Sequence, residues 1–272
     1  MRWWLGVLVA LVGGAALAAT GPLEITGALV QGGLARGQVP PGSEVSFAGR
    51  RLHLDPAGRF LVGFGRDAAS GEVLVVRYPD GSRVQRRLEI APRDYKIQRI
   101  DGLPPREVSP SAEDLVRIQA DAKLIEAARE RDSAEPGLAS AFAWPVVGPI
   151  SGVYGSQRVL NGEPRAPHRG VDIAAPAGTP VGAMADGVVS LAAPDMYFTG
   201  NTVMIDHGYG LHSVYAHLSR LLVKVGQTVR KGQPVGRVGA TGRATGPHLH
   251  WGVYWFDRAL DPALLVGPMP QS

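Results

Sequence analysis

Four of the seven histidines in this 272-residue chain lie in three short motifs between residues 168 and 250. The motifs are His-Arg-Gly-Val-Asp at 168–172, Tyr-Ala-His-Leu at 215–218 and His-Leu-His at 248–250. Side chains on a β-strand alternate between its two faces, so residues two or four positions apart point the same way. If the first and third motifs are strands, each presents two polar groups on one face.

The residues around these motifs favour strands over helices. Gly170 and Val171 lie inside the first motif, Pro176 follows it, and the third motif leads into Trp-Gly-Val-Tyr-Trp at 251–255. Aromatic and β-branched residues are common in strands, whereas Gly and Pro disfavour helices. Imidazole and carboxylate bind Zn²⁺, and a catalytic zinc has three protein ligands and an open position. The motifs hold more ligands than one such site needs, and the chain has no cysteine, which indicates a catalytic rather than a structural zinc.

In this order, and with the glycines and prolines between them, the motifs resemble those of the lysostaphin-like (LytM-type) zinc metalloendopeptidases. These enzymes cut peptide cross-links of the bacterial cell wall, and the resemblance runs from about residue 153 to about residue 262. It implies that His168, Asp172 and His250 bind zinc, and that His217 and His248 are catalytic without being ligands. No motif position is substituted, which favours an enzyme over a non-enzymatic LytM-type regulator that binds the wall.

The resemblance implies that zinc-activated water hydrolyses a peptide bond. We expect one of His217 and His248 to move the proton from the water to the leaving amine, and the other to stabilise the oxyanion. The assignment stays open, although we favour His248 as the base. His212 lies five residues before His217, so a regular strand directs only one of the two to the metal, and the Tyr-Ala-His-Leu setting favours His217. Tyr154 is a candidate for substrate contact or for core packing.

The length leaves room for an export signal followed by about two domains. The 36 glycines and 22 prolines imply many turns and short strands. The expected fold is mainly β: an antiparallel β-sheet metallopeptidase domain of the LytM/lysostaphin type, preceded by a small β-sandwich-like domain and one linker helix. The N-terminal domain is either a targeting, spacing or regulatory module or a passive spacer. The expected boundaries are a signal peptide at 1–18, an all-β domain at 19–92, a connector at 93–141, the metallopeptidase domain at 142–265 and a tail at 266–272.

Residues 1–18 have the pattern of a signal peptide: Arg2, an apolar run from Leu5 to Val12, and Ala-Leu-Ala at 16–18. The apolar run is shorter than the ~20 residues of a spanning helix, so we expect no stable membrane span after cleavage. We therefore expect an exported protein that acts on peptidoglycan peptide stems in the periplasm, the cell envelope or the medium. No run of Lys or Arg indicates nucleic-acid binding. The lack of a recognisable wall-sorting signal or repeated binding module favours direct links over glycine bridges, and the sequence leaves the oligomeric state open.

Within the connector, Leu103-Pro-Pro105 predicts an irregular segment over 93–108. Ser111 and Asp114 have the spacing of a capping box and predict a helix over about 111–131. This helix is expected to pack on the catalytic domain or to cover its groove. Further along, a turn-rich loop is expected at 194–200, beside the groove. The predicted apolar stripe of the helix is Leu115, Ile118, Ala122 and Ile125.

Overall fold

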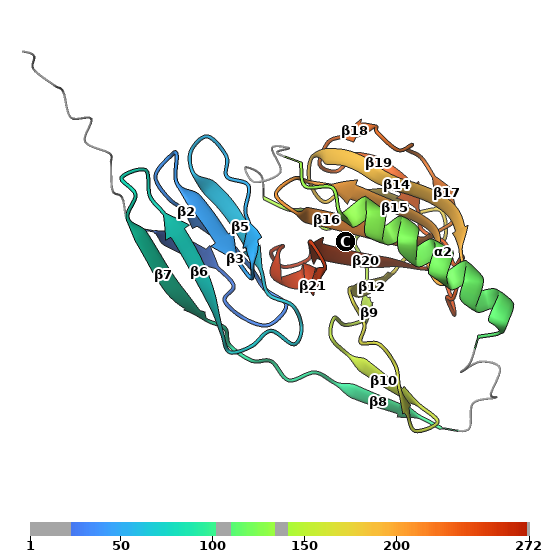
Figure 1. Cartoon of the computed structure of the whole chain (residues 1–272). Coiled ribbons are helices and arrows are strands. Elements are labelled where there is room, and N and C mark those ends of the chain that lie inside the picture. Colours follow the sequence, from blue (N-terminus) through green and yellow to red (C-terminus); the bar gives the residue numbers. More distant parts are fainter. Residues whose placement is uncertain (1–22, 102–109, 134–140, 271–272) are drawn as a thin grey trace, which may run out of the picture.

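The computed structural model describes residues 23–101, 110–133 and 141–270 (Figure 1). The predicted signal peptide at 1–18 therefore lies outside the described residues. The fold is mainly β, as the sequence predicts, with a small N-terminal β-domain, a larger C-terminal β-domain and one α-helix against the larger domain. Within these ranges no helix combines the length and the apolar character that a membrane crossing requires.

The N-terminal domain consists of two small antiparallel sheets that enclose an apolar core. Its strands alternate as a half-buried strand should: Val45 and Phe47 of β3 are buried, whereas Glu44 is exposed. Phe60 and Leu74 from neighbouring strands fill the same core. The first sheet has the order β1 (Glu24–Gly27), β2 (Leu34–Gln38), β5 (Arg59–Gly63), and the second the order β4 (Arg50–Arg51), β3 (Glu44–Phe47), β6 (Gly71–Arg77), β7 (Arg83–Glu89).

A large antiparallel sheet forms the C-terminal domain, in the order β18-β14-β15-β16-β20-β12-β9. The strand β20 is central, because β12 pairs with its first half and β21 with its second half. The strand β16 is buried at every position, which explains why its sequence shows no alternation of polar and apolar residues. The strands are β9 (Ile150–Gly152), β12 (Val171–Ala174), β14 (Gly187–Met196), β15 (Gly200–Asp206), β16 (Leu211–Leu218), β18 (Thr228–Val229), β20 (His248–Trp255) and β21 (Arg258–Leu260).

Smaller elements complete this domain. One three-stranded sheet has the order β13 (Pro180–Gly182), β19 (Pro234–Arg237), β17 (Arg220–Leu221), and a short 3-10 helix, η2 (Pro262–Leu264), follows β21. Beyond it, the start of the predicted tail packs on the domain. The Trp144 indole N–H donates to the carbonyl of Gly267 at 2.9 Å, and the Gly148 N–H lies 3.4 Å from the sulfur of Met269.

Two segments differ from the prediction. The connector at 93–108 is not wholly irregular, because β8 (Ile97–Ile100) pairs in parallel with β10 (Gln157–Leu160), which pairs in turn with β11 (Glu163–Pro164). The partners of β8 lie about sixty residues away, so no local pattern marks this strand. The loop predicted at 194–200 is shorter, because β14 continues to Met196 through a bulge that takes up Pro194.

The helix α2 (Ala112–Arg129) begins with the predicted capping box. The Asp114 N–H donates to the hydroxyl of Ser111 at 3.1 Å, and the Ser111 N–H donates to the carboxylate of Asp114 at 3.2 Å. These bonds satisfy the backbone N–H groups of Ser111 and Asp114, which a helix start otherwise leaves to solvent. In Figure 1, α2 lies across the large sheet, and it contacts β14 and β15.

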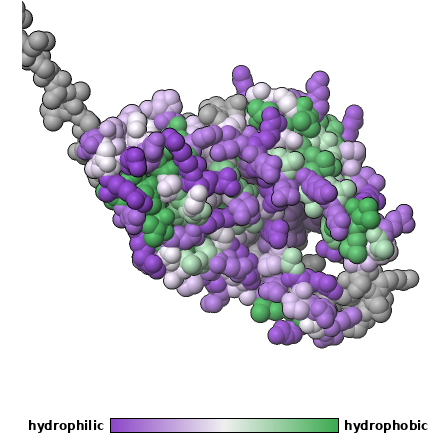
Figure 2. All heavy atoms as spheres, in the orientation of Figure 1, coloured by the Kyte–Doolittle hydropathy of each residue, from purple (hydrophilic) through white to green (hydrophobic). Residues whose placement is uncertain are grey.

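The face that α2 turns to the sheet contains half of the predicted stripe, because Ile118 and Ile125 are partly buried and Ile125 packs against the sheet. Leu115 is 46% exposed and Ala122 is exposed, whereas Asp121 is partly buried and Ala128 is buried. Asp121 lies on this face because its carboxylate accepts the N–H of Tyr197 at 2.7 Å. Leu115, Val116 and Leu124 of α2 remain exposed, and Figure 2 shows hydrophobic atoms at the surface along this helix.

The two β-domains share one hydrophobic core. The Phe47 ring of the N-terminal domain lies 5.8 Å from the Trp255 ring of β20, and both side chains are buried. A Cβ atom added at Gly63 would lie 2.5 Å from the Cβ of Trp255, so only glycine fits at this crossing. The Glu72–Arg258 ion pair, at 2.9 Å, also joins the two domains. The two domains are thus packed against each other through buried side chains.

Candidate active site

The first and third motifs lie on adjacent antiparallel strands. In the pairing of β12 with β20, Asp172 is directly opposite His250, and Ala174 is opposite His248. Paired residues point to the same face of a sheet, so this register brings the two motifs together. His168 lies just before β12, and its side chain reaches the same place. The structure therefore brings together the three residues that the resemblance implies as ligands.

Three ligand atoms of these residues form a nearly equilateral triangle. His168 Nε2 lies 3.0 Å from Asp172 Oδ1 and 3.0 Å from His250 Nδ1, and the latter two atoms are 2.9 Å apart. The centre of such a triangle lies about 1.7 Å from each corner, so an ion slightly above its plane reaches the ~2.0–2.2 Å of zinc bonds to nitrogen and oxygen. Among the described residues this is the one cluster of His, Asp or Glu with the geometry of a metal site.

The backbone fixes the orientation of the His168 ring. Its Nδ1 lies 3.0 Å from the carbonyl of Val153, which can only accept, so Nδ1 carries the proton and Nε2 keeps a lone pair. Such a carbonyl partner behind a ligating histidine is typical of metal sites. On the opposite side, a Cβ atom at Gly152 would lie 2.3 Å from Asp172 Oδ2, so glycine is required beside that carboxylate. The donor set and its supports fit zinc.

Charge is concentrated on Asp172. Burial alone would raise the pKa of its carboxyl, but the interactions with the rings of His168 and His250 outweigh burial and hold the pKa well below its usual value. Burial also lowers the pKa of His250, against the opposing hydrogen bond with Asp172. The cluster therefore presents an ionised carboxylate, and a divalent cation binds carboxylate together with neutral imidazole.

His217 and His248 lie beside the triangle. Their ring centres are 4.8 Å apart, and His248 Nε2 lies 3.9 Å from Asp172 Oδ1. The Nδ1 of His217 faces the carbonyl of Thr241 at 2.8 Å, and the Nδ1 of His248 faces the carbonyl of Gly246 at 2.8 Å. In both rings Nδ1–H therefore donates to the backbone, and Nε2 is left as a proton acceptor. The sequence alone does not point to these two carbonyls, because a backbone group has no signature in the sequence.

His217 reaches the site through an unusual backbone conformation. Its φ is +60°, in the left-handed region that non-glycine residues seldom adopt. Ala216, one position earlier, is the residue directly opposite His250, so a regular strand would direct His217 to the other face. The positive φ brings its ring centre to 6.1 Å from that of His250. Strain of this kind is common at functional sites.

His212 corrects part of the parity argument. It pairs with Tyr254 on β20, so it lies on the same face of the sheet as His250 rather than on the opposite face. It is excluded from the site by distance along the strand and by burial, since it is fully buried and burial lowers its pKa. Ala128 of α2 packs on this same face, farther from the metal cluster.

Tyr154, the candidate for substrate contact, is 4% exposed. Its hydroxyl donates to the carbonyl of Ala259 at 2.7 Å, and its ring packs edge-on against Tyr95 at 6.1 Å. Burial raises the pKa of its phenol. These contacts favour the alternative interpretation, packing between the domains, and we leave Tyr154 out of the proposed substrate contacts.

Known proteins share the sequence around this site. The model of Peptidase family M23 matches residues 166–262. The peptidoglycan DD-endopeptidase ShyA of Vibrio cholerae is 52% identical over 107 residues, which are 39% of this chain and 25% of that protein. The DD-carboxypeptidase/endopeptidase Mpg of Neisseria meningitidis is 44% identical over 104 residues, which are 38% of this chain and 24% of that protein. The match thus spans about a quarter of the length of these curated relatives.

A solved structure extends the similarity to nearly the whole chain. The crystal structure of an M23 peptidase from Pseudomonas aeruginosa is 34% identical in sequence and superposes with a TM-score of 0.68. The superposition covers 88% of this chain and 95% of the other. The similarity therefore includes more than the region with the histidine motifs.

Proposed function

This chain belongs to peptidase family M23, and from that premise we propose that it is a zinc-dependent endopeptidase that hydrolyses peptide cross-links of bacterial peptidoglycan. The observation that carries the proposal is the triangle of ligand atoms on His168, Asp172 and His250, with two more imidazoles beside it. The names of the curated relatives, peptidoglycan DD-endopeptidase and DD-carboxypeptidase/endopeptidase, support this substrate class. An exported protein acting in the cell envelope follows from that substrate and from the signal-like residues 1–18.

A zinc ion held by these three residues would act as a Lewis acid that makes water nucleophilic at neutral pH. The protein's own part is to move a proton. His248 accepts the proton of the attacking water at Nε2, since its Nδ1–H is committed to Gly246, and then passes it to the leaving nitrogen. After it has taken up the proton, the same ring can donate a hydrogen bond to the developing oxyanion.

His217 has a different part in this proposal. Burial lowers the pKa of its imidazole to about 4, although the bond with Thr241 acts in the opposite direction. A ring that resists protonation is a poor proton carrier, and with Nδ1–H donating to Thr241 it offers Nε2 as an acceptor. We assign His217 to orient the water by accepting its hydrogen bond. This differs from the expectation that the second histidine stabilises the oxyanion, because in this tautomer it has no proton to donate there.

Single substitutions separate metal binding from catalysis. His168→Ala and Asp172→Ala are expected to lose both zinc and activity, whereas His248→Ala and His217→Ala keep zinc and lose turnover, by about 10²–10⁴-fold for the proton carrier. Zinc is measured by elemental analysis, and activity by the release of soluble peptides from purified sacculi. His53→Ala, which removes an imidazole in the N-terminal domain, is the matched control.

Two results would contradict the proposal. Full activity of His248→Ala would remove that residue from the chemistry. Wild-type protein that holds zinc and binds sacculi of both direct and glycine-bridged type, but releases no peptide from either, would instead indicate a wall-binding regulator.

A further inference from the structure

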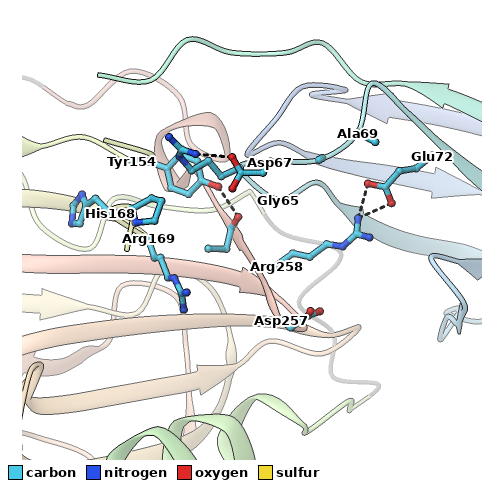
Figure 3. Close-up of a pocket in the computed structure, with 13 residues that line it drawn as sticks. Gly65, Asp67, Ala69, Glu72, Tyr154, His168, Arg169, Asp257 and Arg258 are labelled. Atoms are coloured by element: carbon cyan, nitrogen blue, oxygen red, sulfur yellow. Dashed lines mark hydrogen bonds and ion pairs between the residues drawn. The ribbon is translucent and has the colours of Figure 1, made fainter. Parts of the chain in front are cut away.

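A pocket lies between the two β-domains, next to the metal cluster (Figure 3). Its volume is about 470 Å³, within the range of small-molecule sites. Three segments supply most of its lining: the turn between β5 and β6 at 65–69, the segment 167–169 that precedes β12, and the turn and start of β21 at 257–259. Glu72 and Tyr154 complete it. His168 belongs to the second segment, so the pocket adjoins the cluster of His168, Asp172 and His250.

Most of the charged groups around the pocket are already paired. Arg258 bonds to Glu72 at 2.9 Å, and Arg66 bonds to Asp67 at 2.6 Å (Figure 3). Arg66 also donates to the carbonyl of Gly155 at 2.8 Å, across the domain boundary. The Arg258–Glu72 and Arg66–Gly155 bonds hold the two domains in place around the pocket. The two ion pairs use up four charges, which therefore serve the walls rather than a ligand.

Two charges of opposite sign remain. Arg169 and Asp257 are both exposed, and in the described part of the chain neither forms a hydrogen bond or an ion pair. In Figure 3 both lie on the C-terminal domain's side of the pocket, below the paired groups. A preformed cavity with one free cation and one free anion suits a ligand that carries both charges, since a simple anion or cation would leave one of them without a partner.

The substrate class offers such a group. In walls whose stems are linked directly, the diamino acid before the scissile D-alanine has a side chain that ends in a carbon bearing both an ammonium and a carboxylate. That residue is one position from the scissile bond, and one extended residue advances about 3.3 Å. Its long side chain is therefore the part of the substrate best placed to enter a pocket that begins at His168.

Resting on the proposed function, we propose that the interdomain pocket is a subsite for the zwitterionic end of the diamino-acid side chain, with Arg169 on its carboxylate and Asp257 on its ammonium. The N-terminal domain then has a direct part in recognition, because its turn at 65–69 closes one side of the subsite. The turn is held against the C-terminal domain by the hydrogen bond from Arg66 to the carbonyl of Gly155, and the nearby strand β6 by the Glu72–Arg258 ion pair.

The test is a binding measurement, so that it does not depend on catalysis. Full-length, zinc-loaded His248→Ala protein is titrated by calorimetry with a soluble, directly cross-linked dimer of stem peptides. The dimer is used in two forms, in which the side-chain carboxylate of the diamino acid before the scissile D-alanine is either unmodified or amidated. Arg169→Ala and Asp257→Asn are added to this background, and Arg83→Ala, which removes an exposed arginine of β7 outside the pocket, is the matched control.

Arg169→Ala and Asp257→Asn are each expected to weaken binding of the unmodified dimer roughly five- to tenfold, as a partly exposed charged contact should, while Arg83→Ala has no effect. Amidation should weaken binding by the same factor when Arg169 is present, and have no further effect when it is alanine. Unchanged affinity in Arg169→Ala, or an equal amidation penalty with and without Arg169, would overturn the subsite. A wild-type protein that releases no peptide would overturn the proposed function but leave this result standing.

Discussion

Acid is expected to destabilise this protein through one buried histidine that has no part in the site. His207 is 1% exposed. Its Nδ1 lies 2.7 Å from the carbonyl of Asp186, so Nδ1 carries the proton, and its Nε2 accepts from the hydroxyl of Ser213 at 2.7 Å. The hydroxyl of Tyr215 lies 2.9 Å from the same Ser213 oxygen. A second proton on Nε2 would force the Ser213 hydroxyl to turn its proton away from His207 and would place a charge in the core.

The direction and size of the effect follow from the pKa. Burial lowers the pKa of His207 from 6.5 to about 4. The unfolded chain therefore takes up this proton first as the pH falls, and stability that is fully present above pH 6.5 is lost toward pH 4. The linkage relation gives a loss of about 2 kcal/mol at pH 5 and about 3 kcal/mol at pH 4 from this residue alone.

The assay compares wild type with His207→Gln, whose amide can bond to the same two partners but does not titrate. Urea unfolding at pH 7, 5 and 4, with zinc content matched, gives the free energy of unfolding of each protein. The difference between the two proteins should shift by about 2–3 kcal/mol in favour of the variant between pH 7 and pH 4. Parallel pH profiles for the two proteins would refute the assignment of this acid sensitivity to His207.

Three other substitutions test the supports of the site and of the core. Gly152→Ala places a Cβ 2.3 Å from the Asp172 carboxylate, so zinc content measured by elemental analysis should fall, while Gly267→Ala, with open space around it, should keep full zinc. Asn201→Ala removes a 2.9 Å hydrogen bond from its side chain to the carbonyl of Leu218, the residue after His217. If this bond positions His217, kcat for peptide release should fall about tenfold with zinc and KM unchanged, and an unchanged kcat would contradict that positioning role. Trp255→Ala should cost about 3–5 kcal/mol in urea unfolding, in one transition that both domains share, and separate transitions would show that the core is not shared.

The candidate site was predictable to the extent that its geometry is local. Residues four apart in the first motif and two apart in the third share a strand face, and the structure places Asp172 and His250 in direct register. The sequence does not specify that β12 and β20 are neighbours, because pairing depends on partners far away in the chain. The family resemblance supplied that information.

His217 shows where the strand rule fails. Alternation predicts that His212 and His217 face opposite sides, yet His212 lies on the site face, and His217 reaches the site through its positive φ. The rule thus favoured His217, which does lie beside the triangle, for an incomplete reason. Similarly, the packing face of α2 includes Asp121, whose carboxylate bonds to the backbone of Tyr197. An apolar periodicity cannot reveal such a polar contact.

The strand β20 links the site to the N-terminal domain. Its first residues, His248 and His250, belong to the site, and its last residue, Trp255, lies in the shared core against Phe47. Eight residues of extended chain span about 25 Å, so one rigid element connects the metal cluster to the other domain. Removing the N-terminal domain would expose the Trp255 end of this strand and one wall of the interdomain pocket. A fragment of residues 142–272 is therefore expected to be less stable than the full chain, even though it contains every residue of the proposed metal site.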